Sequence, residues 1–378
     1  MFEVGEEEVR AVRKVLLSKK YYRYPSSENG ECDQFEREFA AKIGVKHAII
    51  LSSGTNALAI ALMARGIGPG DEVIVPAYTF VATAAAVKLA GAKPVIANID
   101  ENLSLSTADT KAKITPRTKA IIPVHMDGLV ADLKGAAALA KAHDLFLLED
   151  CAQALGGSFG KKRLGAFGHA GAFSLNDNKN ISCGEGGIVV TNDSALHETM
   201  FKLHDMASQY NPVRKKLYGE ATPTMGLSTR VSEIQGAIMR VQLKRLDKIL
   251  ARLRERKEIL AEAFGGMRNV KVISGYSKSG DCASALHLRL PDPSFAGRAS
   301  KALIEAGIMA AFPSLRPAHV AWKWMDMIDP SEAKFVTAGL LPSVEIMMST
   351  IKYDVPYDMT AKQTAAVAKK FRAILERV

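Results

Sequence analysis

The lysine at position 179 lies in the segment SLNDNKNISCGEGG, residues 174–187, which follows a short apolar run and ends in a glycine-rich turn. Such a turn fixes the backbone beside it, so the ε-amine is positioned rather than left free in solvent. A positioned, partly desolvated lysine can attack a carbonyl compound and form a Schiff base with it. An exposed surface lysine is the usual alternative, and this segment alone leaves both interpretations open.

Two further segments carry residue types that suit the same chemistry. Asp150 ends the apolar run LFLLED, which places a carboxylate at the end of a predicted strand, where side chains face a ligand crevice. SSGTNAL, residues 52–58, follows another strand and begins a helix, so it gathers hydroxyls and free N–H groups at the positive end of the helix dipole. Taken singly, each segment could equally provide a helix cap.

The three segments together supply what pyridoxal phosphate requires of a protein. These requirements are a site for the phosphate, an acid paired with the pyridine nitrogen, and a lysine that forms an imine. We therefore predict pyridoxal phosphate as the cofactor. We expect no metal site, because the four cysteines have no CxxC spacing.

Composition is that of a globular protein, with 378 residues of which 48% are hydrophobic and 24% charged. No apolar run approaches the roughly 18 to 20 residues of a membrane helix, and the N-terminus is not a signal peptide, so we expect a cytoplasmic protein without a membrane partner. The net charge is +10, but the basic stretch 240–257 has the spacing of a helix with a solvated face. Because it lacks interleaved aromatic residues, we expect no nucleic-acid partner.

Apolar runs alternate with helical patterns over residues 47–205, which predicts a mostly parallel sheet with helices on both faces. A polar stretch over 206–228 reads as a loop, and a long helix follows over about 229–265. The remainder, with a strand at ASALHLRL and helices at FAGRASKALIEAG and TAKQTAAVAKKFRAILERV, has a smaller α+β pattern. We predict a large cofactor-binding domain over 1–245 and a small C-terminal domain over 246–378.

Between Glu28 and Leu246 the chain carries an ordered set of motifs: FEREFAAKIGVKHAIILSSGTNAL, GPGDEVIVPAYTFVATAAAV, ITPRTKAIIPVHMDG, LEDCAQALGG, FSLNDNKNISCGEGGIVVTND and EIQGAIMRVQLKRLD. In these motifs it resembles the DegT/DnrJ/EryC1/StrS family of pyridoxal-phosphate-dependent sugar aminotransferases. The resemblance implies an α/β fold of fold type I. It implies a large domain with a mostly parallel seven-stranded sheet flanked by helices, and a smaller α+β C-terminal domain.

The resemblance also implies roles for individual residues. Lys179 matches the lysine that forms the imine, and Asp150 matches the acid that faces the pyridine nitrogen. The other cofactor positions that it implies are Gln153 near the phenolic oxygen, Phe80 stacked on the ring, His125 near the cofactor, and Thr55, Asn56 and Ser174 at the phosphate.

Two departures from the family pattern concern the phosphate and the substrate. Ser228, in GLSTR, stands where family members place an asparagine that reaches the cofactor phosphate across a dimer interface. In AFPSLRPAH, His319 matches a family histidine and Arg316 is additional. We predict that Arg316, His319 and Arg23 contact the substrate, and that it is an acidic or nucleotide-linked sugar, because arginine favours carboxylates and phosphates.

The function that follows is transfer of an amino group from glutamate to a keto-sugar, in the biosynthesis of a surface polysaccharide or a natural product. We expect a homodimer with shared active sites, in which the loop 206–230 crosses. The segment YYRYPSSENG favours an 8-amino-3,8-dideoxy-manno-octulosonate transaminase among the alternatives. A sugar dehydratase of the same family is a second alternative, although those relatives replace the lysine. The acceptor and the carbon that receives the amine stay open.

Overall fold

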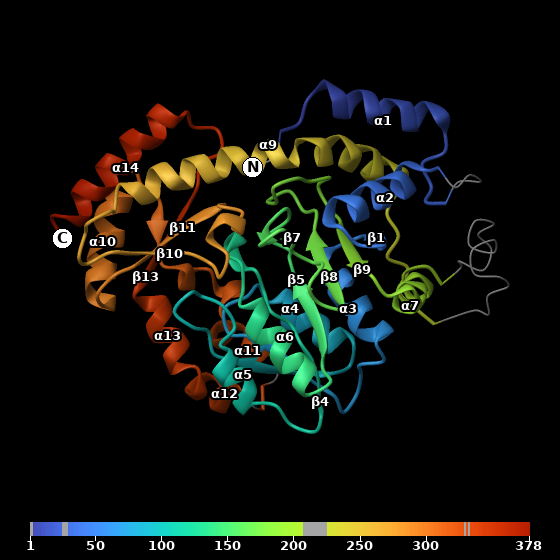
Figure 1. Ribbon diagram of the computed structural model, residues 1–378, viewed down its shortest axis with the longest axis horizontal. Helices are drawn as coiled ribbons and strands as arrows, with labels where there is room; N and C mark the ends of the chain where they lie inside the picture. Colours follow the sequence, from blue (N-terminus) through green and yellow to red (C-terminus); the bar gives the residue numbers. More distant parts are fainter. Residues whose placement is uncertain (1–2, 25–28, 207–224, 329, 332) are drawn as a thin grey trace.

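The computed structural model describes residues 3–24, 29–206, 225–328, 330–331 and 333–378. Nearly all of the predicted loop 206–228, and four residues of the YYRYPSSENG segment, lie outside the described residues. Figure 1 shows a larger α/β part and a smaller part built from the C-terminal third of the chain, with the long helix α9 (Glu233–Glu262) running along both.

The larger part is built on a seven-stranded sheet, which confirms the fold that the sequence predicted. In spatial order its strands are β1 (His47–Leu51), β9 (Gly187–Thr191), β8 (Ala170–Ser174), β5 (Phe146–Asp150), β4 (Thr118–Ile121), β2 (Glu72–Pro76) and β3 (Lys93–Ala97). Only β9 runs antiparallel to its two neighbours. The other pairs are parallel, so their carboxyl ends meet at one edge of the sheet.

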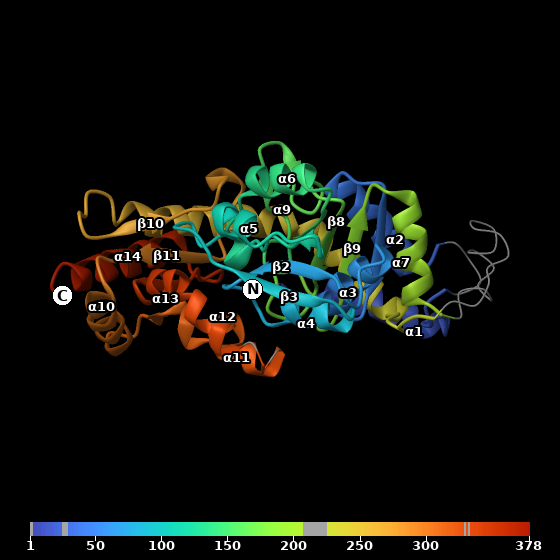
Figure 2. The ribbon, with the colours of Figure 1, turned by 90° about the horizontal axis from the view of Figure 1, so that it is seen from below.

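Helices cover both faces of this sheet (Figure 2). One face carries α3 (Gly54–Ala64), α4 (Ala82–Leu89) and α7 (Ser194–His204), and the other carries α2 (Glu31–Ile43), α5 (Thr107–Ala112), α6 (Leu133–Ala142) and part of α9. In β2, Val73 and Val75 pack toward α3 and α4, whereas Ile74 packs toward α6. Most strand residues between the two helical layers are apolar for this reason, so the strands read as nearly continuous hydrophobic runs, and Glu149 in β5 is a buried exception.

The smaller part is an antiparallel sheet in the order β10 (Lys271–Ile273), β11 (Ala285–Arg289), β13 (Thr350–Asp354) and β12 (Ala310–Ala311). Its helices are α10 (Pro293–Glu305), α11 (Ala321–Ile328), α12 (Ala333–Gly339), α13 (Leu341–Met348) and α14 (Ala361–Leu375). The predicted strand and both predicted helices of this region are confirmed. Since α9 continues across residues 245 and 246, the domain boundary there stays a prediction.

Helix α1 (Glu6–Ser18) lies along α9 in Figure 1. A short hairpin, β6 (Ser158–Phe159) and β7 (Lys162–Arg163), extends from the loop after β5. Among the helices of the described residues, none has the length and apolar character that crossing a bilayer requires.

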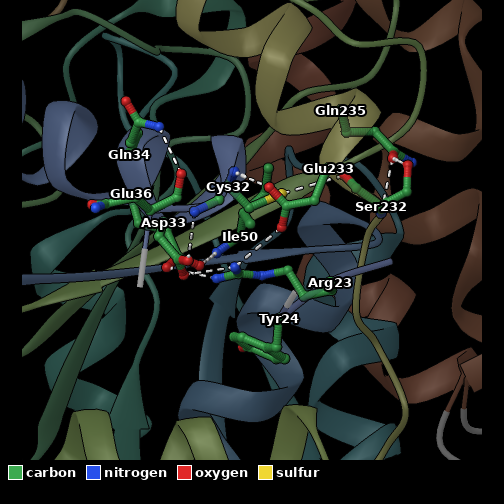
Figure 3. Close-up of polar contacts among 12 residues, drawn as sticks. Arg23, Tyr24, Cys32, Asp33, Gln34, Glu36, Ile50, Ser232, Glu233 and Gln235 are labelled. Carbon is green, nitrogen blue, oxygen red and sulfur yellow. Dashed lines mark hydrogen bonds and ion pairs between the residues drawn. The ribbon is translucent and has the colours of Figure 1, made fainter. Parts of the chain in front are cut away.

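Arg23 is buried in a network of ion pairs and does not line the cavity described below, so the structure does not support its predicted contact with the substrate. Its side chain is 1% exposed and its guanidinium contacts Asp33 at 2.7 Å, Glu36 at 2.9 Å and Glu233 at 3.5 Å, as Figure 3 shows. The guanidinium also lies 4.0 Å from the centre of the Tyr24 ring. Arg23 therefore ties the chain before α2 to α2 and to the first turn of α9, away from the cavity described below.

Three carboxylates share this one arginine, so they cannot all be compensated equally. Glu36 also accepts a hydrogen bond from the Ile50 backbone N–H at 2.8 Å. Burial nevertheless raises the pKa of Glu36 to about 7, although Arg23 opposes the shift. Between about pH 4.5 and pH 7, Glu36 is therefore protonated in the folded protein and ionised in the unfolded chain, where its pKa has the ordinary value of 4.5.

The stability that Glu36 contributes should be greatest below about pH 4.5 and should be lost as the pH rises through about 7. Glu36→Gln keeps an acceptor for Ile50 and removes the titration. When the pH rises from 5 to 8, we expect the free energy of unfolding of the wild type to fall by up to about 3 kcal/mol relative to that of Glu36→Gln. Denaturant titrations at both pH values measure this, with Glu38→Gln on the same helix as control. Parallel pH profiles of the wild type and Glu36→Gln would contradict the expectation.

Candidate active site

A cavity of about 670 Å³ opens at the carboxyl edge of the large sheet, between the two parts of the molecule. Asp150, at the end of β5, and Lys179, in the turn between β8 and β9, both line it. The three segments that the sequence singled out therefore meet in one place, because Ser53, Gly54 and Thr55 at the start of α3 also line this cavity.

The carboxylate of Asp150 is buried and held at both oxygens. One oxygen accepts from the Ala152 N–H at 3.0 Å and the other from the Thr83 hydroxyl at 2.8 Å. Burial raises the pKa of Asp150, while these two donors and the nearby Lys179 oppose the rise. Such a carboxylate gains most from a partner that brings positive charge into the cavity, as a protonated pyridine nitrogen does.

The turn that carries Lys179 is anchored on both sides of the lysine. Asn180, buried beside it, donates from its amide to the Leu155 carbonyl at 3.0 Å, which joins this turn to the loop after Asp150. The Lys179 N–H donates to the Asn176 carbonyl at 3.1 Å. Burial lowers the pKa of the Lys179 amine, although the carboxylates of Asp150 and Asp127 oppose the shift. Asn180 and the Asn176 carbonyl thus position the lysine.

The opposite end of the cavity has the form of an anion site. Ser53 Oγ accepts from the Asn56 N–H at 3.1 Å, whereas the N–H groups of Gly54 and Thr55 have no acceptor within the helix. Ser174, at the end of β8, lines the same cavity. A Cβ on Gly187 would lie 2.3 Å from the Ser53 carbonyl and 2.5 Å from the Gly54 nitrogen, and one on Gly54 would lie 3.0 Å from Ser174 Cβ. Glycine at these two positions therefore keeps the strand ends and the helix start in contact.

Phe80 and His319 form the wall between the two parts. Their ring centres are 5.3 Å apart, and the chain around Phe80 is paired with the chain around His319 through Thr79 N–H to the His319 carbonyl at 3.0 Å. Burial lowers the pKa of His319 to about 4, so its ring is neutral at pH 7. The backbone pairing and the ring contact together place Phe80 as an aromatic face on the cavity.

The network around Asp127 was not anticipated from the sequence. Its carboxylate accepts from the Tyr78 hydroxyl, from His287 Nε2 at 3.0 Å and from Lys352 Nζ. Its backbone N–H donates to the Gln153 side chain at 3.0 Å, and its carbonyl accepts from the Ser284 hydroxyl at 2.7 Å. Asp127 therefore connects a cofactor position, Gln153, with two strands of the smaller sheet. Its sequence signal was weak: an acid two residues after His125.

Of the residues predicted from sequence, eight line the cavity: Thr55, Phe80, Asp150, Gln153, Ser174, Lys179, Arg316 and His319. Asn56 lies just outside, where its side chain donates to the Ser52 hydroxyl at 2.9 Å. Ser228 is exposed and away from the cavity of its own chain. Its predicted contact across a dimer interface stays a prediction.

His125 lies behind Asp150 rather than in the cavity. The His125 backbone N–H donates to the Asp150 carbonyl at 3.0 Å. In the ring, Nδ1 accepts from the Ala131 N–H at 3.0 Å and Nε2 faces Glu149 at 3.4 Å. His125, Glu149 and Cys151 have the spacing of metal ligands. Glu149, however, already accepts from the N–H groups of Gly165, Phe167 and Gly168, so this cluster is a buried hydrogen-bond network.

The fold and the cavity define a fold type I transferase of the pyridoxal-phosphate-dependent class. The family model described as the DegT/DnrJ/EryC1/StrS aminotransferase family matches residues 3–368, so the chain belongs to that family.

The chain is 39% identical over 259 residues, 67% of its length, to the spore coat polysaccharide biosynthesis protein SpsC of Bacillus subtilis. It is 43% identical over 219 residues, 58% of its length, to a GDP-perosamine synthase of Caulobacter vibrioides. These matches span 65% and 57% of the two relatives' own lengths. The structure of an aminotransferase from Psychrobacter cryohalolentis has a TM-score of 0.85 at 28% identity, covering 99% of this chain and 98% of that one.

The residues of the cavity fit pyridoxal phosphate, the cofactor of this class. Asp150 would face the pyridine nitrogen, Lys179 would hold the cofactor covalently, and the start of α3 with Ser174 would hold the phosphate. The buried carboxylate and the cradle made by Gly54 and Gly187 are the observations that support this fit.

Gly187→Ala should weaken cofactor binding, because its methyl group would push the Ser53–Gly54 backbone out of place. We expect the Kd for pyridoxal phosphate to rise at least about tenfold, the equivalent of 1.4 kcal/mol. Fluorescence titration of the cofactor-free protein measures this. Gly297→Ala is the matched control, because a Cβ there meets nothing within 4 Å. An unchanged Kd in Gly187→Ala would exclude the assigned phosphate end.

Proposed function

We propose that this protein transfers an amino group from glutamate to a keto-sugar and so makes an amino sugar. The observation that carries the proposal is the presence of Lys179 and Asp150, an amine and an acid, in one cavity that also contains an anion site. The names of the two relatives, a GDP-perosamine synthase and a spore coat polysaccharide biosynthesis protein, support an amino sugar as the product.

Each residue has a defined task in this reaction. Pyridoxal phosphate supplies, when bound, an electron sink for the carbon that loses its proton. The Lys179 amine moves that proton from the donor's α-carbon, and its lowered pKa favours the neutral form that accepts protons. Asp150 keeps a proton on the pyridine nitrogen, and Gln153, whose oxygen is occupied by the Asp127 N–H, retains its NH₂ group as a donor.

Amino transfer is favoured over sugar dehydration by Lys179, since the dehydratases of this family replace that lysine. Among acceptors, both a nucleotide-linked hexose and the octulosonate expected from the YYRYPSSENG segment fit an amino transfer of this kind. The chemistry at Lys179 is common to both.

Glutamate added alone to the holoenzyme should release about one equivalent of 2-oxoglutarate per active site, because the amino group stays on the cofactor until an acceptor arrives. Lys179→Ala should slow this release at least about a hundredfold while keeping the fold. Borohydride reduction followed by peptide mapping should place the cofactor on Lys179, with the exposed Lys161 as the control position. A label elsewhere, or full activity in Lys179→Ala, would overturn the assignment.

We further propose that the protein is a homodimer with a shared active site. Support comes from an apolar groove in which Val9, Leu16 and Leu17 of α1 lie exposed against Cys183 and Gly184, a few residues after Lys179. The exposed Ser228 lies just before α9 and offers a hydroxyl to the phosphate site of a second copy.

The double variant Val9→Glu/Leu16→Glu should shift sedimentation from dimer to monomer and should lower the glutamate reaction with it, because two carboxylates would be buried in the apolar groove. Ile304→Glu, an exposed apolar position on α10, is the control and should leave the dimer intact. A stable, fully active wild-type monomer would refute the proposal.

A further inference from the structure

Four charged side chains of alternating sign form a chain along one wall of the active-site cavity. Lys352 contacts the Asp127 carboxylate and, at 3.2 Å, Asp354, which in turn accepts from Arg316 Nη2 at 2.9 Å. All four side chains line the same cavity as Lys179. Lys352 and Asp354 are two residues apart on β13, so both project to the same side of the strand.

The chain of charges is fixed at one end and loose at the other. The side chains of Asp127 and Lys352 are 6% and 8% exposed, and Tyr78 and His287 hold Asp127 from behind. Asp354 and Arg316 are 57% and 53% exposed. Ion pairs at this exposure contribute little, because water stabilises each charge when the pair opens. The outer pair can therefore open while the inner pair stays closed.

Opening the outer pair does not leave Asp354 without a cationic partner. Asp354 contacts two cations, so it keeps Lys352 when Arg316 leaves. Arg316 contacts Asp354 through one nitrogen, Nη2, whereas a guanidinium has five N–H donors arranged to bind a carboxylate through two parallel hydrogen bonds. A carboxylate ligand would therefore be a better partner for Arg316 than Asp354 is.

The donor requires such a partner, because glutamate carries a second carboxylate on its side chain. Three lysine or arginine side chains line the cavity in the described part of the chain: Lys179, Lys352 and Arg316. Lys179 is used in the reaction and Lys352 is enclosed by two carboxylates, whereas His319 is neutral at pH 7 because burial lowers its pKa to about 4. Arg316 is the cation that remains.

We propose that Arg316 exchanges Asp354 for the side-chain carboxylate of glutamate and returns to Asp354 when the keto-sugar replaces the donor. This inference rests on the proposed amino transfer, in which one cavity must receive two unlike substrates in turn. In the open state the wall presents a guanidinium to a carboxylate. In the closed state it presents Asp354 and Arg316, a neutral pair of acceptor and donors, to sugar hydroxyls. In this proposal Arg316 binds the donor, whereas the sequence alone predicted that it contacts an acidic acceptor.

The donor half-reaction tests the exchange without knowledge of the acceptor. Glutamate is compared with glutamine, whose side chain has nearly the same shape but no charge, by single-turnover conversion of the holoenzyme. Arg316→Gln should lower kcat/KM for glutamate about 10- to 100-fold, the range expected for a charged hydrogen bond, and should leave glutamine nearly unchanged. Lys323→Gln, an exposed cation outside the cavity, should change neither.

Asp354→Asn supplies a second, opposite test. It weakens the hold on Arg316, so glutamate should bind several-fold more tightly, whereas a loss of glutamate affinity would overturn the exchange. Calorimetry with glutarate and its monoamide, which have no amino group to react, measures the same preference as binding alone. The wild type should prefer glutarate, and Arg316→Gln should bind the two equally.

Failure of the proposed amino transfer and failure of the exchange at Arg316 give different results. If the wild type releases no 2-oxoglutarate from glutamate, the proposed function fails. If it does, and Arg316→Gln retains the wild-type ratio of glutamate to glutamine, the function stands and the exchange at Arg316 is refuted.

Discussion

The structure depends on keeping a buried carboxylate and a half-buried amine in one cavity without letting them neutralise each other. Burial raises the pKa of Asp150 and lowers the pKa of Lys179, so each charge is costly there unless something holds it. The protein meets this cost with fixed donors, the Ala152 N–H and the Thr83 hydroxyl, on the acid. It holds the lysine's chain through Asn180 and not through its charge. The amine is thus left free to react.

Asp127 is a second buried charge that is held by fixed partners, and these partners come from both parts of the protein. It has a positive φ of 51°, a conformation that costs a residue other than glycine on the order of 1 kcal/mol. Burial alone would raise the pKa of Asp127, yet Lys352 and His287 hold it well below its usual range. The backbone therefore places one ionised carboxylate where Tyr78 of the larger part and His287 and Lys352 of the smaller part reach it, while the Asp127 N–H donates to Gln153. The Asp127 side chain is one of several contacts that join the two parts, beside the hydrogen bonds from Tyr276 to Asp100 and from Arg289 to Glu101.

The sequence predicted what is local and missed what is paired over long distances. The strands, the helix starts and the positions of Asp150 at a strand end and of Lys179 before a turn follow from runs of fewer than twenty residues, in which periodicity and turn residues carry the signal. The contact between Asp127 and Lys352 joins residues 225 positions apart, and no periodicity encodes it. Arg23 illustrates the same limit. Beside three tyrosines it looked like an exposed ligand contact, but its partners Asp33, Glu36 and Glu233 lie in segments that only the fold brings together.

Charge and exposure are distributed unequally over the cavity, and this distribution matches the two kinds of work that an aminotransferase performs. Asp150 and Ser174 of the large sheet are buried, and Asp150 is held by two fixed donors, which suits a cofactor that stays in place. The wall from the smaller part becomes more exposed from Lys352 to Arg316, so its interactions weaken toward the solvent. A site that receives two different substrates in turn needs such a gradient. Its inner contacts must keep the reacting carbon in place, while its outer contacts must change partners at little cost.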